Sequence, residues 1–480
     1  MLNTASSRLL CIGGLLAAAA VGLVLLAPEF HYEAALSQRP TALFVGLLIG
    51  AGALYLLLLR ITGHCAPSAK LLWLCFVIGL LMRIVQFAGP PIYENDFYRY
   101  LWDGAVTAQG LDPYAEAPND IQKHRSVSAL LKSLPGAKHT PQLDQLAALT
   151  SNSGLVFQRI GYPHLSTIYP PLAQAGFAAA YWIEPFSLNA WRLVLLVAEI
   201  LSFLLIFQLL RTSAQNPLWS LLYWWNPLVI SEFANSAHME PLLLPFLLAA
   251  FWALHRHRRF LVALGLALAA AVKLWPLALA PSLLQRGQPR VQSYAAVGLL
   301  VILVPIFLWP QLRHLADPQT GLFNYAADWQ RNSFAFYWLS RGLALLVQNT
   351  NYADTAARAV VAVVVSGLAL WLLPRATANM HTQARHWCIV IAALFLLGPT
   401  GYPWYFAWFL PFLCLWRNPA LLALTVVLPL YYTRFPLTAN DLHHVFQHWV
   451  VTLEFLPIWL GLGWLAWRHF HSRQLASPHA

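Results

Sequence analysis

A cluster of acidic and aromatic residues between positions 93 and 104 holds the side chains best suited to chemistry in this sequence. Glu94, Asp96 and Asp103 accompany Arg99 and five aromatic residues there, directly after an apolar run that ends near Ala88. A carboxylate shielded by aromatic rings at the start of a polar loop is placed to take a proton from a hydroxyl group. Asp96 is therefore a candidate general base. From these residues alone, a solvated face in which the acids pair with Arg99 is the more common arrangement.

Lys273 is a second candidate, because it lies in an apolar segment, Ala269 to Leu277, that contains no acid. An unpaired ammonium group is costly in such surroundings, so its partner must come from elsewhere in the fold or from a ligand. A lipid phosphate at the membrane surface would serve. The alternative is that the flexible side chain simply extends to the water interface.

A third polar segment, Ser231 to Glu240, lies between two apolar runs and contains Glu232, Asn235 and His238. Imidazole and carboxylate groups are frequent neighbours of divalent cations and phosphates. His238 and Glu240 are therefore candidates to join Asp96 around such a group. Two residues do not make a site, and an interfacial loop with ordinary polar residues is the alternative unless another segment converges on it.

Two aromatic segments, Trp329 to Phe334 and Gly401 to Tyr405, also stand out. Aromatic rings next to prolines suit stacking on a sugar and equally suit the aromatic belt of a membrane protein. Arg83 and Glu199 fall inside apolar runs, where charged residues usually pair with each other, so structural pairing is the expectation for both.

The composition places these residues in a membrane protein. Of the 480 residues, 59% are hydrophobic and 14% aromatic, which is more apolar surface than one soluble core can bury. The net charge of +11 comes from basic residues spread singly among apolar runs, which indicates membrane topology and not nucleic-acid binding. The five cysteines lie in apolar runs or short basic loops, so no disulfide framework is expected.

The apolar runs are long enough for several of them to cross ~30 Å of hydrocarbon. We expect five regions, and the segment 170–184 is left open as a span or a re-entrant helix. The regions are N-terminal spans at 1–88, an outer loop with the catalytic segment at 89–168, core spans with a lysine hairpin at 169–309, a second outer loop at 310–354, and C-terminal spans at 355–480.

The distribution of charge predicts the orientation of these spans. The proposed inner loops collect Arg and Lys but no Asp or Glu, which is the pattern of cytoplasmic loops. Basic clusters at 255–259 and 286–290 would both lie inside, so the segment between them must go out and return. Lys273 would then lie at the turn of a short hairpin, towards the outer side.

Several short motifs follow one another between about residues 90 and 415, and as an ordered set they resemble the GT-C superfamily of integral-membrane glycosyltransferases. The likeness is to the bacterial enzymes around glycosyltransferase family 87, including mannosyltransferases, that use polyprenyl-phosphate sugars. The motifs are Asp96 with Arg99 to Gly104, Ile168 to Pro171, Asn226-Pro227 with His238 and Glu240, Lys273 with Trp275-Pro276, Trp329 with Arg331-Asn332, and Tyr402 to Tyr405.

This resemblance implies a fold and an activity. The fold is an all-α polytopic GT-C-like bundle of about 12–14 transmembrane helices, with a large first outer loop of short amphipathic helices. The activity is inverting transfer of a sugar from a polyprenyl-phosphate-linked donor to a hydroxyl of a glycan, lipid or protein acceptor. The setting is the bilayer of a bacterial inner membrane with the site facing the periplasm, and nucleic acid is not a partner.

The resemblance also implies roles for residues. Asp96 would be the base and Glu94 a helper, and the substrate-binding residues would be Arg99, Tyr169, His238, Glu240, Lys273, Arg331, Tyr402 and Trp404. Relatives often have His-x-Asp where this chain has His238-Met239-Glu240, so a divalent cation is left open, with Asp96, His238 and Glu240 as its candidate ligands.

Two rival functions share many of these features. A flippase or transporter of lipid-linked sugars would need the spans and the phosphate-binding lysine, but no general base. A polymerase or ligase of glycans would use a pyrophosphate-linked donor in the same compartment. The sequence specifies neither the donor sugar nor the acceptor.

Overall fold

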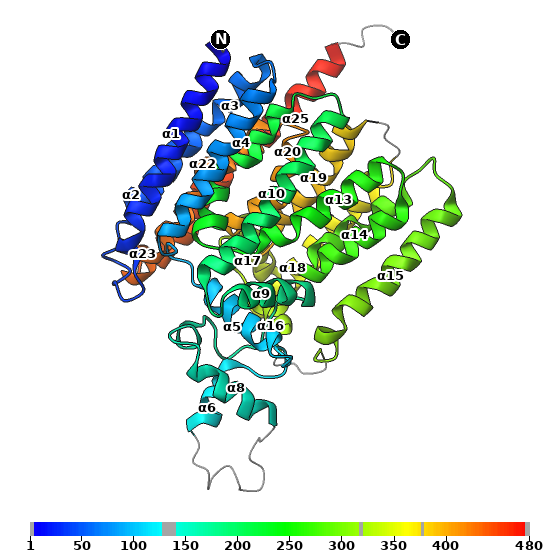
Figure 1. Ribbon diagram of the computed structural model, residues 1–480. Coiled ribbons are helices and arrows are strands. Elements are labelled where there is room, and N and C mark those ends of the chain that lie inside the picture. Colours follow the sequence, from blue (N-terminus) through cyan, green and yellow to red (C-terminus); the bar gives the residue numbers. More distant parts are fainter. Residues whose placement is uncertain (1–3, 127–140, 316–319, 376–378, 476–480) are drawn as a thin grey trace.

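Long apolar helices run side by side through the computed structural model, which describes residues 4–126, 141–315, 320–375 and 379–475 (Figure 1). Within these residues, eight helical segments are long and apolar enough to cross a membrane, and a bent pair makes a ninth if it counts as one span. The described residues form no β-strand, only one isolated bridge between Arg331 and Thr400. The chain is therefore an all-α polytopic membrane protein, as predicted. The eight segments are Thr4–Phe30, Thr41–His64, Ala69–Ala88, Leu188–Thr212, Arg290–Leu312, Thr350–Leu372, Pro419–Ala439 and His443–His471.

Side-chain caps define the starts of several of these helices. Ser68 and Ser187 each accept a hydrogen bond from the backbone N–H three residues on, at the starts of α4 (Ala69–Ile84) and α10 (Leu188–Thr212). Asn349 and Asn379 do the same for the first N–H groups of α18 (Thr350–Leu372) and α19 (Met380–Leu397). Each cap satisfies backbone donors that have no partner inside the helix.

Shorter helices lie between the spans. The segment left open by the sequence is α9 (Pro171–Ile183), which has 13 residues and so rises only about 20 Å, too little to cross the hydrocarbon. The other short helices are α5 (Asp96–Ala108), α6 (Pro118–Ser126), α8 (Pro141–Ser151), α13 (Leu244–His255), α14 (Arg259–Val272), α16 (Gly321–Asp328) and α17 (Ala335–Val347).

Two apolar parts of the core take an irregular form. The apolar runs at 218–230 and 241–254 become a helix pair, Pro227–Asn235 and Glu240–His255, bent by 101°. The run at 404–415 becomes a 3₁₀ segment, Pro403–Trp408, followed by the short α20 (Leu410–Leu413). Each of the four helical pieces begins at or next to a proline, so prolines favour short pieces over one continuous helix.

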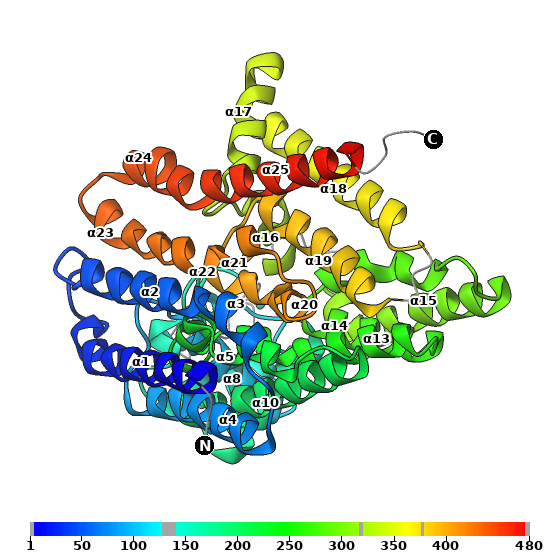
Figure 2. The ribbon, with the colours of Figure 1, turned by 90° about the horizontal axis from the view of Figure 1, so that it is seen from above.

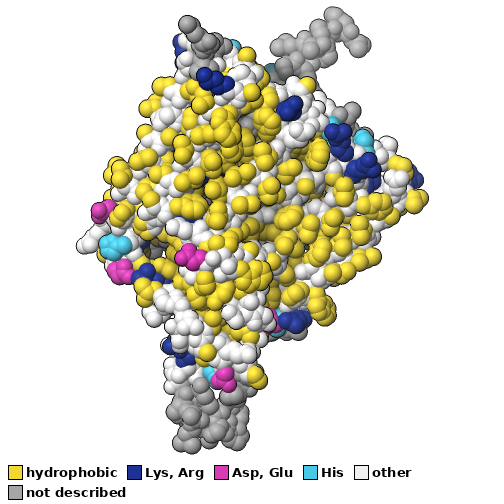
Figure 3. Space-filling model, viewed as in Figure 1, with side chains coloured by type: hydrophobic (Ala, Val, Ile, Leu, Met, Phe, Trp, Pro, Cys, Tyr) yellow, Lys and Arg dark blue, Asp and Glu magenta, His cyan; other side chains and the backbone are white. Residues whose placement is uncertain are grey.

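The two ends of the bundle differ. Both termini lie at the top of Figure 1, with α1 (Thr4–Leu26) and α25 (Val451–Leu475), while α5, α6 and α8 lie at the opposite end. In Figure 3, the Lys and Arg side chains on the upper part of this face have no acidic neighbours, and Asp and Glu appear from the middle downwards. Seen from above in Figure 2, α17 and α18 lie together and project from one edge of the bundle.

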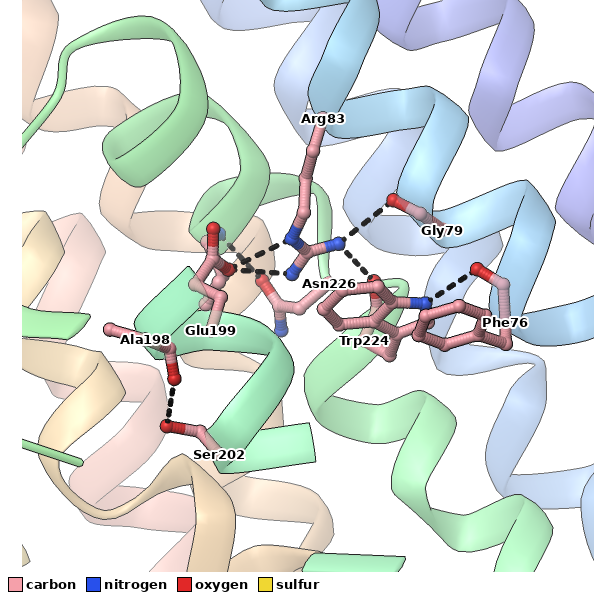
Figure 4. Close-up of polar contacts among 9 residues, drawn as sticks. Phe76, Gly79, Arg83, Ala198, Glu199, Ser202, Trp224 and Asn226 are labelled. Atoms are coloured by element: carbon pink, nitrogen blue, oxygen red, sulfur yellow. Dashed lines mark hydrogen bonds and ion pairs between the residues drawn. The ribbon is translucent and has the colours of Figure 1, made fainter. Parts of the chain in front are cut away.

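A buried ion pair joins α4 to α10, as predicted for Arg83 and Glu199 (Figure 4). The Arg83 Nη2 atom lies 2.7 Å from Glu199 Oε2, and both side chains are almost fully buried. Arg83 Nη1 also donates to the Trp224 carbonyl at 2.7 Å, and its guanidinium lies 3.8 Å from the centre of the Trp224 ring. A Cβ at Gly79 would come within 2.3 Å of that ring, so the missing side chain lets the helices meet there. The pair serves the fold.

Candidate active site

A cavity of about 650 Å³ opens among the helices at the end opposite the termini. Its walls come from seven parts of the chain: the start of α5 with the residues just before it, the segment before α9, the bent helix pair, the turn after α14, α16 with Trp329, the aromatic segment that begins at Gly398, and the segment from Tyr431 to Phe435. Eight of the ten residues predicted for the site line this cavity, namely Glu94, Asp96, Arg99, Tyr169, Glu240, Lys273, Tyr402 and Trp404.

Asp96 is the first residue of α5 and lines the cavity, with 35% of its side chain exposed. Helix α5 is held against α9 by a close approach, because a Cβ at Gly104 would lie 2.4 Å from the Phe177 carbonyl oxygen. Burial, together with the nearby Glu240 carboxylate, raises the pKa of Asp96 to about 6, although Lys273 and Arg99 act in the opposite direction. A carboxyl with this pKa is ionised near neutral pH and is a stronger base than an ordinary aspartate.

Glu94 lies just before α5, after a tight turn. Tyr93 adopts a left-handed backbone with φ of 63°, and the Glu94 N–H donates to the Ile92 carbonyl at 2.8 Å. Burial raises the pKa of Glu94 well above its usual range, and the carboxylates of Asp96 and Glu232 add to this shift. Two acidic groups with perturbed pKa values therefore face the same cavity. The pKa of Asp96 is raised less than that of Glu94, so Asp96 is ionised near pH 7 and is the better proton acceptor.

Lys273 caps the C-terminal end of α14, where its side chain meets an acid from a distant part of the chain. Its Nζ lies 2.6 Å from Glu240 Oε1 and 4.0 Å from the centre of the Tyr405 ring. It also lies 5.0 Å from the centre of the Trp408 ring. The apolar segment around Lys273 contains no acid, and Glu240 supplies the partner from elsewhere in the fold. Glu240 Oε2 remains buried without a hydrogen bond from the described residues.

His238 lies behind the wall and does not line the cavity. Its ring stacks on Trp404 with the ring centres 3.7 Å apart. Its Nδ1 is 4.0 Å from Asp96 Oδ2, and its Nε2 is 3.5 Å from Glu232 Oε2. In the part of the chain that the structure describes, no three His, Cys, Asp or Glu side chains gather closely enough to hold a metal ion. Asp96, His238 and Glu240, the predicted candidate ligands, lie near one another but are not arranged to coordinate a metal ion.

Aromatic side chains make up another part of the wall. Tyr402 stacks on Trp404 with ring centres 4.4 Å apart, and its hydroxyl accepts a hydrogen bond from Trp329 Nε1 at 2.9 Å. Tyr169 meets Tyr100 edge to face, with ring centres 5.1 Å apart. Flat, immobilised rings of this kind can contact the apolar face of a sugar ring.

The two predicted arginines are engaged elsewhere. Arg99 lines the cavity, but its Nη2 donates to the carbonyls of Tyr162 and Leu165, at 3.2 and 3.0 Å, and so ties the outer loop to α5. Arg331 does not line the cavity, and its Nη1 donates to the Gln330 carbonyl at 2.9 Å. Its backbone forms the bridge to Thr400.

Several lining residues were missed by sequence reasoning. Tyr325 and Trp408 extend the aromatic wall, and Arg434 adds a cation from the seventh long apolar segment. The run Tyr431 to Phe435, in which an arginine interrupts aromatic residues near the end of a span, was the available signal for Arg434. Its nearness to residue 94 was not readable, since more than 300 positions separate them.

A membrane bundle with acidic groups, a paired lysine and aromatic rings around one cavity is consistent with an integral-membrane glycosyltransferase of the GT-C type. Residues 167–400 match the family model of glycosyltransferase family 87, and residues 1–132 match a model described as the N-terminal domain of alpha-(1->6)-mannopyranosyltransferases. The two matches together support a GT-C-type mannosyltransferase of family 87. No curated protein and no solved structure matches it significantly.

Proposed function

We propose that this protein is an inverting mannosyltransferase that moves a sugar from a polyprenyl-phosphate-linked donor to an acceptor hydroxyl on the outer face of a bacterial inner membrane. The observation that carries the proposal is Asp96, a carboxylate whose pKa is raised to about 6 on the wall of a cavity that also holds Lys273. The acceptor of the transferred sugar is a glycan, lipid or protein hydroxyl.

Asp96 accepts the proton of the acceptor hydroxyl as the oxygen attacks the anomeric carbon. The bond from that carbon to the phosphate oxygen breaks, and the electron pair leaves with the polyprenyl phosphate. Lys273 stabilises the negative charge that grows on this phosphate, and its position over the Tyr405 ring limits the directions in which it can point. One displacement without a covalent intermediate inverts the configuration of the sugar.

The Lys273–Glu240 contact fits this role for the lysine. A partly buried ammonium is retained in the unliganded fold because Glu240 neutralises it at 2.6 Å. When a phosphate binds, the Lys273 ammonium gains a second anionic partner. Glu240 then holds Lys273 in position, and the ammonium donates hydrogen bonds to both Glu240 and the phosphate. Apolar residues on the same cavity wall, among them Leu274 and Leu322, suit the first isoprene units of the donor.

The test is transfer of labelled mannose by the purified protein from a short-chain polyprenyl phosphomannose to octyl α-D-mannopyranoside. We expect transfer, with a β-linked donor giving an α-linked product by NMR. Retained configuration contradicts the single displacement. Movement of the donor across a vesicle membrane without transfer supports a flippase, and activity only with a pyrophosphate-linked donor supports a polymerase or ligase. A parallel reaction with EDTA and added Mn²⁺ tests the divalent cation.

A further inference from the structure

The cavity contains a second charged region, formed by Glu94 and Arg434, that the proposed roles leave unused. Lys273 and Arg99 are the cations that lower the pKa of Asp96, whereas Arg434 is the cation that lowers the pKa of Glu94.

A row of aromatic rings gives the order along the cavity. Lys273 lies over Tyr405, the ring centres of Tyr405 and Tyr402 are 5.4 Å apart, those of Tyr402 and Tyr431 are 5.9 Å apart, and the Tyr431 hydroxyl accepts a hydrogen bond from Arg434. Asp96 lies beside the middle of this row, because His238, 4.0 Å from Asp96, stacks on Trp404, which stacks on Tyr402. The Lys273–Glu240 pair and the Glu94–Arg434 region therefore lie at opposite ends of the row.

Both members of this second region have unused hydrogen-bonding capacity. Glu94 Oε1 is shielded from water and accepts no hydrogen bond from any residue that the structure describes. The Arg434 guanidinium donates through Nη1 to the Tyr431 hydroxyl at 3.0 Å, and the described residues show no other hydrogen bond from it. A buried acceptor without a donor is costly in a folded protein unless a ligand or water completes it.

Aromatic rings frame the same region. Phe435 lines the cavity and stacks on Tyr93 with ring centres 4.2 Å apart and planes 9° from parallel. The Arg434 guanidinium lies 5.5 Å from the centre of the Phe435 ring. A carboxyl, a guanidinium and flat rings around one space suit a neutral polyol, whose hydroxyls both donate and accept hydrogen bonds and whose ring carbons contact an aromatic surface.

An anion suits this region less well. It would approach the Asp96 carboxylate, and like charges at close range are strongly unfavourable. A neutral sugar avoids this repulsion and uses both the acceptor atoms of Glu94 and the donor groups of Arg434.

We propose that Glu94 and Arg434 bind the sugar residue of the acceptor. The inference rests on the proposed function, because an in-line displacement places the attacking hydroxyl on the side of the anomeric carbon opposite the leaving phosphate. With the donor phosphate at Lys273, the acceptor must enter from the side of Asp96 that faces Glu94 and Arg434. Glu94 is on this account a binding residue for the acceptor and not a second base.

The experiment measures the KM for octyl α-D-mannopyranoside and the KM for short-chain polyprenyl phosphomannose in Glu94→Gln and Arg434→Gln. We expect the acceptor KM to rise about tenfold or more in each variant, because each substitution removes a hydrogen-bonding atom from the site, while the donor KM changes by less than about twofold. Arg434→Lys keeps the charge but loses the planar guanidinium. Its acceptor KM should therefore lie between that of the unaltered protein and that of Arg434→Gln. Matched controls are Glu29→Gln and Arg341→Gln, which change the same charges at exposed positions away from the cavity.

The outcomes separate the possible errors. Absence of transfer in the unaltered protein overturns the proposed function itself. Transfer in the unaltered protein, with a donor KM that rises in Arg434→Gln while the acceptor KM stays unchanged, overturns the acceptor site. If inorganic phosphate competes with the acceptor and this competition is lost in Arg434→Gln, the ligand of the site is an anion and the neutral ligand is overturned. If methyl α-mannoside competes and phosphate does not, the neutral ligand is supported. Thermal unfolding of each purified variant identifies misfolded protein, and Arg434→Lys keeps the test decisive if Arg434→Gln does not fold.

Discussion

Asp96 gains its basicity from its surroundings. Its carboxylate is partly removed from water and lies near Glu240, so holding a proton is easier there than in water. An ordinary aspartate would be fully ionised near neutral pH but would be a weak proton acceptor. The raised pKa moves Asp96 towards the range in which a general base is both ionised and effective.

This environment predicts the pH dependence of the reaction. Because Asp96 must be ionised to act as base and its pKa is raised to about 6, kcat/KM should fall as the pH is lowered through about 6. At pH 5 about one tenth of the carboxyl groups remain ionised, so the rate should be about tenfold below its plateau. Transfer assays between pH 4.5 and 8 measure this profile. A rate that stays constant down to pH 5 assigns the base to another group.

Replacement of Asp96 by asparagine keeps its size and removes the proton acceptor. Turnover by Asp96→Asn should fall about 10²-fold or more, while binding of the donor persists. Asp120→Asn is the matched control, because Asp120 is an acid of the same outer loop that pairs with Lys123 and does not line the cavity. Near-parental transfer by Asp96→Asn, measured in single turnover, would show that a different carboxylate serves as the base.

Lys273 requires a paired design, since removal of the lysine alone leaves Glu240 buried without its cation. Lys273→Met should therefore both destabilise the protein and weaken donor binding, the latter by ~1.5 to 3 kcal/mol. In Lys273→Met/Glu240→Gln the buried charge is absent, so thermal stability should recover while donor affinity stays low. Donor affinity that recovers together with stability would reject the contact between Lys273 and the phosphate.

At the level of elements, the bent helix pair explains how acids reach the cavity from within the bundle. The first half ends in a π-helical turn, Ile230–Asn235, and Ala237 has a φ of 62°. The break leaves backbone groups outside regular helix, which a membrane protein tolerates where the segment is enclosed by protein or lines a cavity. It also turns Glu240 towards Lys273, across the 33 positions that separate them in the sequence.

The Arg83–Glu199 pair tests how the elements are held together. Arg83→Leu leaves the Glu199 carboxylate buried without its cation, and we expect a loss of about 3–5 kcal/mol in the free energy of unfolding. In Arg83→Leu/Glu199→Leu most of that loss should be recovered, because no buried charge remains. Denaturation in detergent measures both variants. Equal instability of the single and double variants would show that Arg83 acts mainly through its contact with Trp224.

Sequence patterns predict some elements better than others. Hydropathy locates long spans such as α1 and α10, because about 20 successive apolar residues are needed to cross the membrane and few other structures require them. It cannot locate the 101° bend, because both halves are apolar and differ only in direction. The partner of Lys273 and the position of Arg434 depend on how distant segments pack, which hydropathy does not describe. A motif also does not fix the direction of a side chain, since the Arg331 side chain donates to a backbone carbonyl.

At the scale of the whole molecule, the distribution of charge and the fold agree. The two basic clusters at 255–259 and 286–290 meet in space, where the Gln288 Nε2 and His257 Nδ1 atoms are 2.9 Å apart. Arg259 also hydrogen-bonds to the Leu283 carbonyl. Helix α14 and the 3₁₀ segment Trp275–Leu284 thus form the predicted hairpin, with Lys273 at the turn between them. The cavity lies at the other end of this hairpin.

The orientation of the molecule is tested by cysteine labelling. Cys11 is the one exposed native cysteine, so Cys11→Ser provides a background with low labelling. In that background Gln288→Cys should react with a membrane-impermeant maleimide only in inside-out vesicles, and Asp120→Cys should react in intact spheroplasts, since acid-free basic loops remain in the cytoplasm. Transfer activity of each variant confirms that it is folded. Reaction of Gln288→Cys in intact spheroplasts would place the basic clusters outside and the cavity inside, and the donor would then have to be used on the cytoplasmic face.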